Sequence, residues 1–141
     1  MKARRVLRAL VVALVRTLRN DPARADAIER WRVSASEQLT AIESLAAREG
    51  IAPEGLRLRI DRREMSMQLI LAGLRYHLDE EFPHLRRRFG DESLGVLRAN
   101  CFDDSFRLQK LAAALSGAPA LQTQLQALAQ HLLALPEAEA R

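Results

Sequence analysis

The feature that most constrains the fold of this chain is a regular apolar seam between residues 94 and 115. The seam consists of Leu94, Leu97, Cys101, Asp104, Leu108, Leu111 and Leu115, separated alternately by three and four residues. That spacing places these side chains on one stripe of an α-helix and matches the heptad seam by which helices pack together. The pattern predicts a helix over residues 91–116 whose stripe is buried against other helices.

Further segments share this helical period and lead to an all-α prediction. They are residues 3–19, 22–49, 62–81 and 119–135, separated by Gly or Pro. Pro83 is expected to interrupt the third of these, with one more turn over residues 85–89. A chain of 141 residues suits one domain with one core. We therefore expect residues 1–141 to form a single antiparallel bundle of about five helices, with residues 136–141 as a frayed tail.

Residues 51–60 are ambiguous at this level. Pro53 and Gly55 mark a turn, and residues 56–60 alternate apolar and basic side chains as a short strand does. The same residues also suit the first turns of a helix, so an irregular or extended segment and a helix both stay open. Residues 61–64 have the pattern of a capping box and predict that the next helix starts there.

The net charge of +4 is concentrated at the N-terminus. Residues 1–20 hold six of the 22 basic residues and none of the 18 acidic ones, so the rest has a slight negative excess. The helix predicted over residues 3–19 has an apolar face of Leu7, Leu10, Leu14 and Leu18 and a basic face that includes Arg5 and Arg8. Such a helix can lie on an anionic membrane, direct a chain to an organelle, or dock on a partner. Packing into the bundle is favoured, since its leucines match the other stripes.

A helix-turn-helix unit is one interpretation of residues 45–63. Ala46, Gly50 and Leu56 suit the small, turn and apolar positions of such a unit. Its second helix would offer these side chains to the phosphates and guanine edges of DNA: Arg57, Arg59, Arg62 and Arg63. Two observations argue against this interpretation. Arg59 falls where a buried apolar residue is expected, and neighbouring acidic residues cancel most of the local charge.

One group of residues has the composition of a metal site. His77, Glu81 and His84 would share a helix face, and these residue types bind zinc or iron. However, Pro83 falls between the ligands, and the second Glu-x-x-His pair of di-iron bundles is missing. A solvated helix end is the preferred interpretation, and no metal is predicted.

Asp104 is the only charged residue within the seam of residues 94–115. A carboxylate on a buried stripe needs a partner, because an unpaired buried charge is costly. We expect a buried ion pair that fixes the helix register, with Arg75, Arg98 or His131 as the partner.

The sequence contains no recognisable catalytic constellation. There is no Gly-rich phosphate loop and no Ser/His/Asp or Cys/His arrangement, and Cys101, Phe102 and Phe106 are interpreted as core material. The single cysteine excludes an intramolecular disulfide and fits a reducing, cytoplasmic compartment. The prediction is a non-enzymatic, cofactor-free helical module for protein–protein interaction, such as an adaptor, assembly chaperone or small regulatory subunit. Its partner would be another protein or a second copy. DNA binding and membrane-surface attachment through residues 1–19 are the alternatives.

Overall fold

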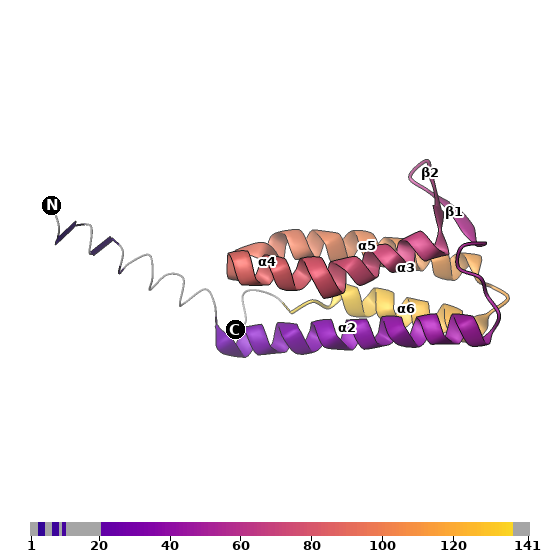
Figure 1. Ribbon diagram of the computed structural model, residues 1–141, viewed down its shortest axis with the longest axis horizontal. Coiled ribbons are helices and arrows are strands. Elements are labelled where there is room, and N and C mark those ends of the chain that lie inside the picture. The colour runs from indigo at the N-terminus through magenta and orange to yellow at the C-terminus, as the bar shows by residue number, and fades with distance from the viewer. Residues whose placement is uncertain (1–2, 5–6, 9, 11–20, 137–141) are drawn as a thin grey trace.

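The computed structural model describes residues 3–4, 7–8, 10 and 21–136. The described part is mostly helical, with one small two-stranded sheet. Its elements are α2 (Pro22–Arg48), β1 (Arg57–Ile60), β2 (Arg63–Ser66), α3 (Met67–Tyr76), the π-helical η1 (His77–Glu81), α4 (Phe82–Phe89), the 3-10 turn η2 (Gly90–Ser93), α5 (Leu94–Ala114) and α6 (Pro119–Leu133) (Figure 1). The helical class is confirmed. Most of the helix predicted over residues 3–19 lies outside the described residues, so the count of five stays a prediction.

α2 begins and ends at the signals that the sequence carries. The Asp21 carboxylate accepts a hydrogen bond from the Ala23 N–H at 2.9 Å, and Pro22 occupies the first turn, where its missing N–H leaves no bond unmade. Gly50 follows the helix with a φ of +70°, a conformation that favours glycine. The apolar stripe is buried: Ile28, Trp31, Ala35, Leu39, Ile42 and Ala46.

Residues 57–66 form an antiparallel β-hairpin, so the strand alternative is correct for this segment. The strands pair from Arg57 opposite Ser66 to Ile60 opposite Arg63. Ile60 is buried, whereas Arg57 and Arg59 are exposed, so the alternation along β1 separates the two faces of the hairpin.

The capping box predicted over residues 61–64 is wrong. Asp61 and Arg62 form the turn between the strands, with φ values of 50° and 66°, and the next two residues belong to β2. Non-glycine residues adopt this left-handed conformation at a cost of about 1–2 kcal/mol each. α3 is capped later instead, where Ser66 Oγ accepts a hydrogen bond from the Leu69 N–H at 3.0 Å.

Pro83 does not interrupt the helix, contrary to expectation, because the helix widens just before it. α3, η1 and α4 follow one another directly, and the Phe82 N–H donates to the His77 carbonyl five residues back. A proline inside a regular α-helix leaves a carbonyl unpaired and clashes with the preceding turn. The π-helical turn changes the bonding pattern at that place and accommodates the ring.

The predicted seam of residues 94–115 is buried at all of its positions, and so are four leucines of α6: Leu121, Leu125, Leu128 and Leu132. α5 begins at Leu94, three residues later than predicted, because η2 precedes it. Ser105 Oγ donates to the Ala129 carbonyl at 2.8 Å, and Gln122 Nε2 donates to the Ala112 carbonyl at 2.8 Å. These bonds fix the antiparallel register of α5 and α6.

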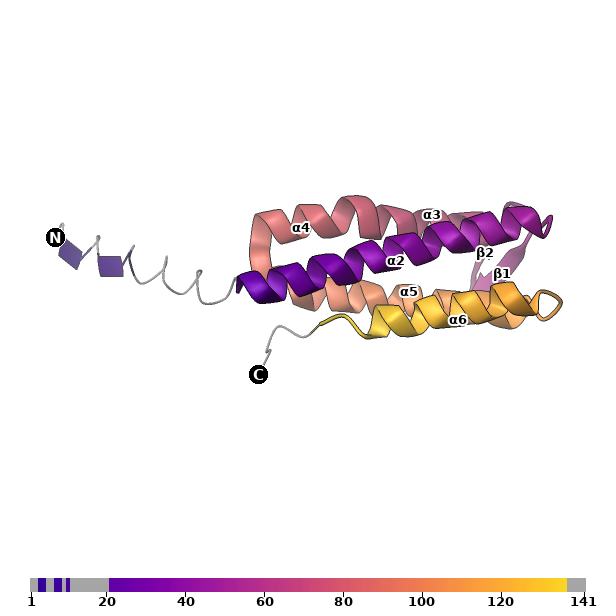
Figure 2. The ribbon, with the colours of Figure 1, turned by 90° about the horizontal axis from the view of Figure 1, so that it is seen from below.

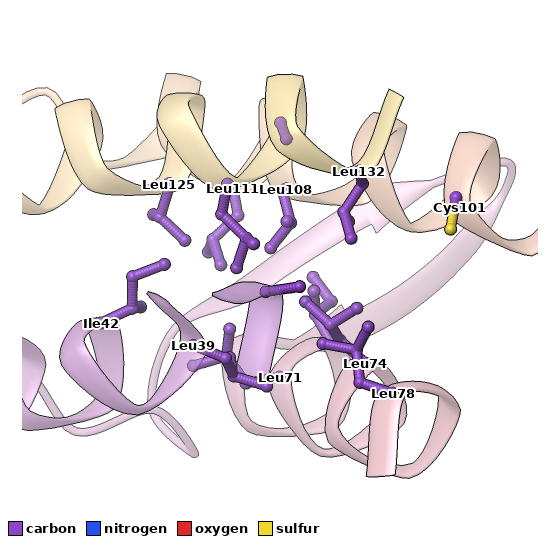
Figure 3. Packing of buried hydrophobic residues seen from close by; sticks show 14 of the residues in the cluster. Leu39, Ile42, Leu71, Leu74, Leu78, Cys101, Leu108, Leu111, Leu125 and Leu132 are labelled. Carbon is purple, nitrogen blue, oxygen red and sulfur yellow. The ribbon is translucent and has the colours of Figure 1, made fainter. Parts of the chain in front are cut away.

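The core lies between two helix pairs. α2 runs beside α3 and η1, and α5 runs beside α6, with α6 also packed on α2 (Figures 1 and 2). Side chains from both pairs point toward one another (Figure 3), among them Leu39, Ile42, Leu71, Leu74, Leu108, Leu111, Leu125 and Leu132. No helix among the described residues is long and apolar enough to cross a membrane.

Candidate functional site

Asp104 lies in a small polar cluster where η1 meets α5. Its Oδ2 atom is 2.7 Å from His77 Nδ1, and its Oδ1 atom is 3.3 Å from the Arg107 guanidinium. Burial raises the pKa of Asp104, while the hydrogen bond from His77 and the charge of Arg107 oppose the rise. The cluster therefore joins two helices through a buried carboxylate that has partners on both oxygens.

The three partners expected for Asp104 lie elsewhere. Arg75 forms an ion pair with Glu43 of α2, and the Arg98 guanidinium donates to the Pro136 carbonyl at 3.4 Å. Arg75 follows Leu74 on α3 and turns toward α2, away from α5. Helical spacing fixes which face a residue occupies but not which neighbouring helix that face meets, so these assignments failed.

His131, the third expected partner, ties α6 to α2. Trp31 Nε1 donates to the His131 carbonyl at 2.8 Å, and His131 Nε2 donates to the Trp31 carbonyl at 3.0 Å. The two rings stack with centres 5.4 Å apart. The two hydrogen bonds and the stacked rings thus hold α6 against α2.

The space beside Asp104 is too small for a substrate. The cavity holds about 10 Å³ and is lined in part by His77, Asn100 and Cys101, which is room for about one water molecule. Burial and the charge of Asp104 raise the pKa of the Cys101 thiol to about 12, so the thiol is protonated near neutral pH. The arrangement holds helices together and offers no activated nucleophile.

The residues considered as metal ligands do not converge. His77 contacts Asp104, Glu81 Oε1 accepts a hydrogen bond from Asn100 Nδ2 at 2.6 Å, and His84 is exposed on α4. Across the described part of the chain, no group of three His, Cys, Asp or Glu side chains is placed to hold a metal ion.

The arginines proposed to contact nucleic acid lie on the hairpin, which stands out from the side of the helices (Figure 1). They are Arg57, Arg59, Arg62 and Arg63, and all are exposed. The first three line a shallow recess of about 380 Å³ together with Glu64, whose carboxylate is 3.7 Å from the Arg57 guanidinium. A helix-turn-helix unit needs a helix here, and two strands occupy its place, so that unit is not formed.

The residues proposed for a membrane or partner face at the N-terminus are described only in part. Leu7, Leu10 and Arg8 are helical and exposed. Arg5, Leu14 and Leu18 lie outside the described residues.

Exposed apolar side chains form a stripe along the outer side of α5, and α6 contributes one exposed leucine. Phe102 is 64% exposed and Phe106 39%, and Ala99 and Ala113 continue the exposed stripe along α5. Leu133, which is 47% exposed, lies one turn beyond Ala129, and Phe102 lies one turn before Ser105. The antiparallel register therefore brings Leu133 and Phe102 to the same level. We define Ala99, Phe102, Phe106, Ala113 and Leu133 as the aromatic face.

The interpretation of Phe102 and Phe106 as core material is wrong, although that of Cys101 is correct. A signal for their exposure was present in the sequence. Phe102 follows the seam residue Cys101 directly, and one residue corresponds to a rotation of about 100° around a helix. Phe102 therefore lies about 100° from Cys101 and, two residues before Asp104, about 160° from that seam residue, so the seam as a whole turns Phe102 outward.

Comparison with known proteins identifies no relative, since no protein-family model, no curated protein and no solved structure matches the chain. The functional argument therefore depends on the described residues themselves. The fold explains the buried cluster around Asp104, whereas the aromatic face and the hairpin arginines have no evident part in holding the fold together.

Proposed function

We propose that this chain is a helical protein–protein interaction module that binds through the aromatic face. The observation that carries the proposal is the exposure of Phe102 and Phe106 on the outer side of α5, where neither is covered by a helix of the described chain. Phenylalanine loses about 1.5–3 kcal/mol of favourable burial when it stays in water. Clustered exposed aromatic residues are typical of interface centres, where a partner covers them.

The polar cluster supports a binding role over a catalytic one. Asp104 and His77 are the pair most similar to an acid–base dyad, but their cavity has room for about one water molecule. Cys101 is buried beside them with a raised thiol pKa. Residues that would do chemistry in an enzyme thus hold α5 against η1 in this fold.

A photo-crosslinking side chain placed at position 102 tests the proposal in cells that express the full chain. We expect a discrete protein crosslink at this position. The matched control carries the same group in place of Tyr76, an aromatic residue of α3 that is 56% exposed but lies outside the aromatic face. The proposal fails if position 102 crosslinks no more than position 76 does.

A second candidate function is binding of nucleic acid by the hairpin. Arg57 and Arg59 lie on the same exposed face of β1, and Arg62 borders the recess beside them. A two-stranded β-ribbon fits the major groove of DNA, where arginine reads guanine. Glu64 opposes this role because it neutralises part of the charge, which is why the hairpin ranks second.

Binding of duplex DNA across a salt series separates the hairpin from the basic N-terminus. Each lost phosphate contact changes the log–log salt slope by about 0.9, so Arg57→Ala/Arg59→Ala should reduce the slope by about 1.8 if both arginines bind phosphate. Arg4→Ala/Arg8→Ala removes the same charge from the N-terminal segment. If only Arg4→Ala/Arg8→Ala reduced the salt slope, the hairpin would be excluded as the binding site and the binding would be assigned to residues near the N-terminus.

A further inference from the structure

A second seam runs along the outer side of α5. Its members are Ala99, Phe102, Phe106, Gln109 and Ala113, separated by three, four, three and four residues, and all of them are exposed. This is the spacing by which one helix packs along another. None of the helices between residues 21 and 136 covers it. The spacing therefore indicates a helix as the partner of the aromatic face.

The charges beside this seam are arranged for an antiparallel contact. Asp103 and Lys110 are seven residues apart, so they occupy the same heptad position and the same flank of the seam. Neither forms an ion pair within the described part of the chain, and Lys110 Nζ lies 5.3 Å from the centre of the Phe106 ring. When two such helices pack in parallel, one side of the seam on the first helix faces the other side of the seam on the second. When they pack antiparallel, the same side of the seam faces itself, so the side with Asp103 and Lys110 meets its own copy.

We propose that the helix is α5 of a second copy of this chain, packed antiparallel about a two-fold axis. This inference rests on the proposed function, because it names the partner of the aromatic face. The charge pattern supports a copy over an unrelated helix, since Asp103 of each chain then lies opposite Lys110 of the other. A two-fold contact requires such self-complementarity.

The same register gives suitable packing at both ends of the contact. Phe102 of one copy lies over Ala113 of the other, so a large side chain meets a small one, and Leu133 adds apolar surface at the rim. The alternative antiparallel register stacks Phe102 on Phe106 but sets Asp103 against Asp103. Like charges that face each other across an interface are strongly unfavourable, which selects the first register.

The dimer should be weak. The seam from residue 99 to residue 113 is about 21 Å long at 1.5 Å per residue. A standard stable interface buries about 800 Å² on each partner, and a single helix contact of this length provides less. We therefore expect a dissociation constant in the micromolar range.

Charge exchange between two variants tests both the partner and its direction. In Asp103→Lys both charge pairs of the dimer become repulsive, and the same holds in Lys110→Glu. Analytical ultracentrifugation of the full chain from low to high micromolar concentration should show self-association weakened at least about tenfold in each variant. An equimolar mixture should recover the wild-type affinity as a heterodimer, because the lysine introduced in one variant then faces the glutamate introduced in the other. Circular dichroism checks that both variants are folded.

Phe102→Ser/Phe106→Ser should abolish self-association, and Tyr76→Ser should leave it unchanged. The inference is overturned if the wild-type chain stays monomeric over the whole concentration range. The seam would then be covered by something other than a second copy, such as residues 1–20 or another protein. The inference is also overturned if the two charge variants do not recover association on mixing. The proposed function is judged separately by the crosslinks in cells. A crosslink from position 102 to a different protein, with a monomeric wild-type chain, would retain the function and remove the second copy.

Discussion

Each long face of α5 holds one type of residue that is unusual for its exposure. On the inner face an ionisable residue, Asp104, is buried, whereas on the outer face the aromatic residue Phe102 is 64% exposed. Asp104 has His77 and Arg107 as partners within the chain. Phe102 and Phe106 have no helix over them in the described structure. The comparison shows that the fold accounts for the inner face, while the outer face needs an explanation in binding.

Leucine and phenylalanine substitutions on the two faces should give the largest contrast. Leu108 is fully buried, so Leu108→Ala should lower the free energy of unfolding by about 3 kcal/mol through lost burial and a cavity. Phe102→Ala on the outer face should change it by less than about 0.5 kcal/mol. Urea unfolding at a protein concentration well below the dissociation constant of the proposed dimer measures both. Equal losses would mean that Phe102 belongs to the core of the monomer.

The buried contact between Asp104 and His77 should give the next largest effect. His77→Ala removes the partner of Asp104 Oδ2 and leaves the carboxylate with Arg107 alone. We therefore expect the free energy of unfolding to fall by about 2 kcal/mol. His77→Ala/Asp104→Leu should regain much of that loss, because no buried charge remains. His84→Ala is the matched control, since His84 is exposed. If His77→Ala had the same free energy of unfolding as wild type, the contact between His77 and Asp104 would contribute nothing to stability.

Thiol reactivity distinguishes the two faces through their exposure to solvent. Cys101 is buried and its thiol pKa is raised to about 12, so iodoacetamide should label it only after unfolding. In Cys101→Ala/Phe102→Cys, the single thiol moves to the outer face and should react in the native protein at low concentration. Mass spectrometry follows both reactions. If Cys101 reacted rapidly with iodoacetamide in the folded protein, the inner face of α5 would not be buried as described.

Local signals predicted the parts of the fold that depend on local interactions. The seam from Leu94 to Leu115 and the start of α2 at Asp21 were readable because helical period and capping involve residues close in sequence. The hairpin was harder, since Asp61 suits the first position of such a turn but Arg62 stands where glycine is typical. Pairing of β1 with β2 selects a conformation that Arg62 does not favour by itself.

The candidate site was less predictable than the fold. The partners of Asp104 were misassigned, because helical spacing places Asp104 on the inner face of α5 but does not determine which side chain of a neighbouring helix meets it. Phe102 and Phe106 were placed in the core by composition, although the phase of the seam already turned Phe102 outward. Hydrophobicity describes what a residue gains from burial, and only the phase of its helix determines whether its own chain provides that burial.

The smallest effect we predict concerns the pH dependence of the inner face. Burial raises the pKa of Asp104 above its ordinary value of 3.8, so the folded protein binds this proton more tightly than the unfolded chain does. The stability linked to that difference is fully present below about pH 4 and is lost as pH rises through the folded-state pKa. Asp104→Asn stays neutral and lacks this loss.

Urea unfolding of wild type and Asp104→Asn between about pH 3 and pH 5.5 measures this linkage and stays below the ordinary histidine titration. The stability of wild type relative to the variant should fall as pH rises. If His77 and Arg107 outweighed burial, the carboxylate would be favoured in the folded state and the relative stability would rise instead. The sign of one slope thus decides whether the inner face merely tolerates the charge of Asp104 or is stabilised by it.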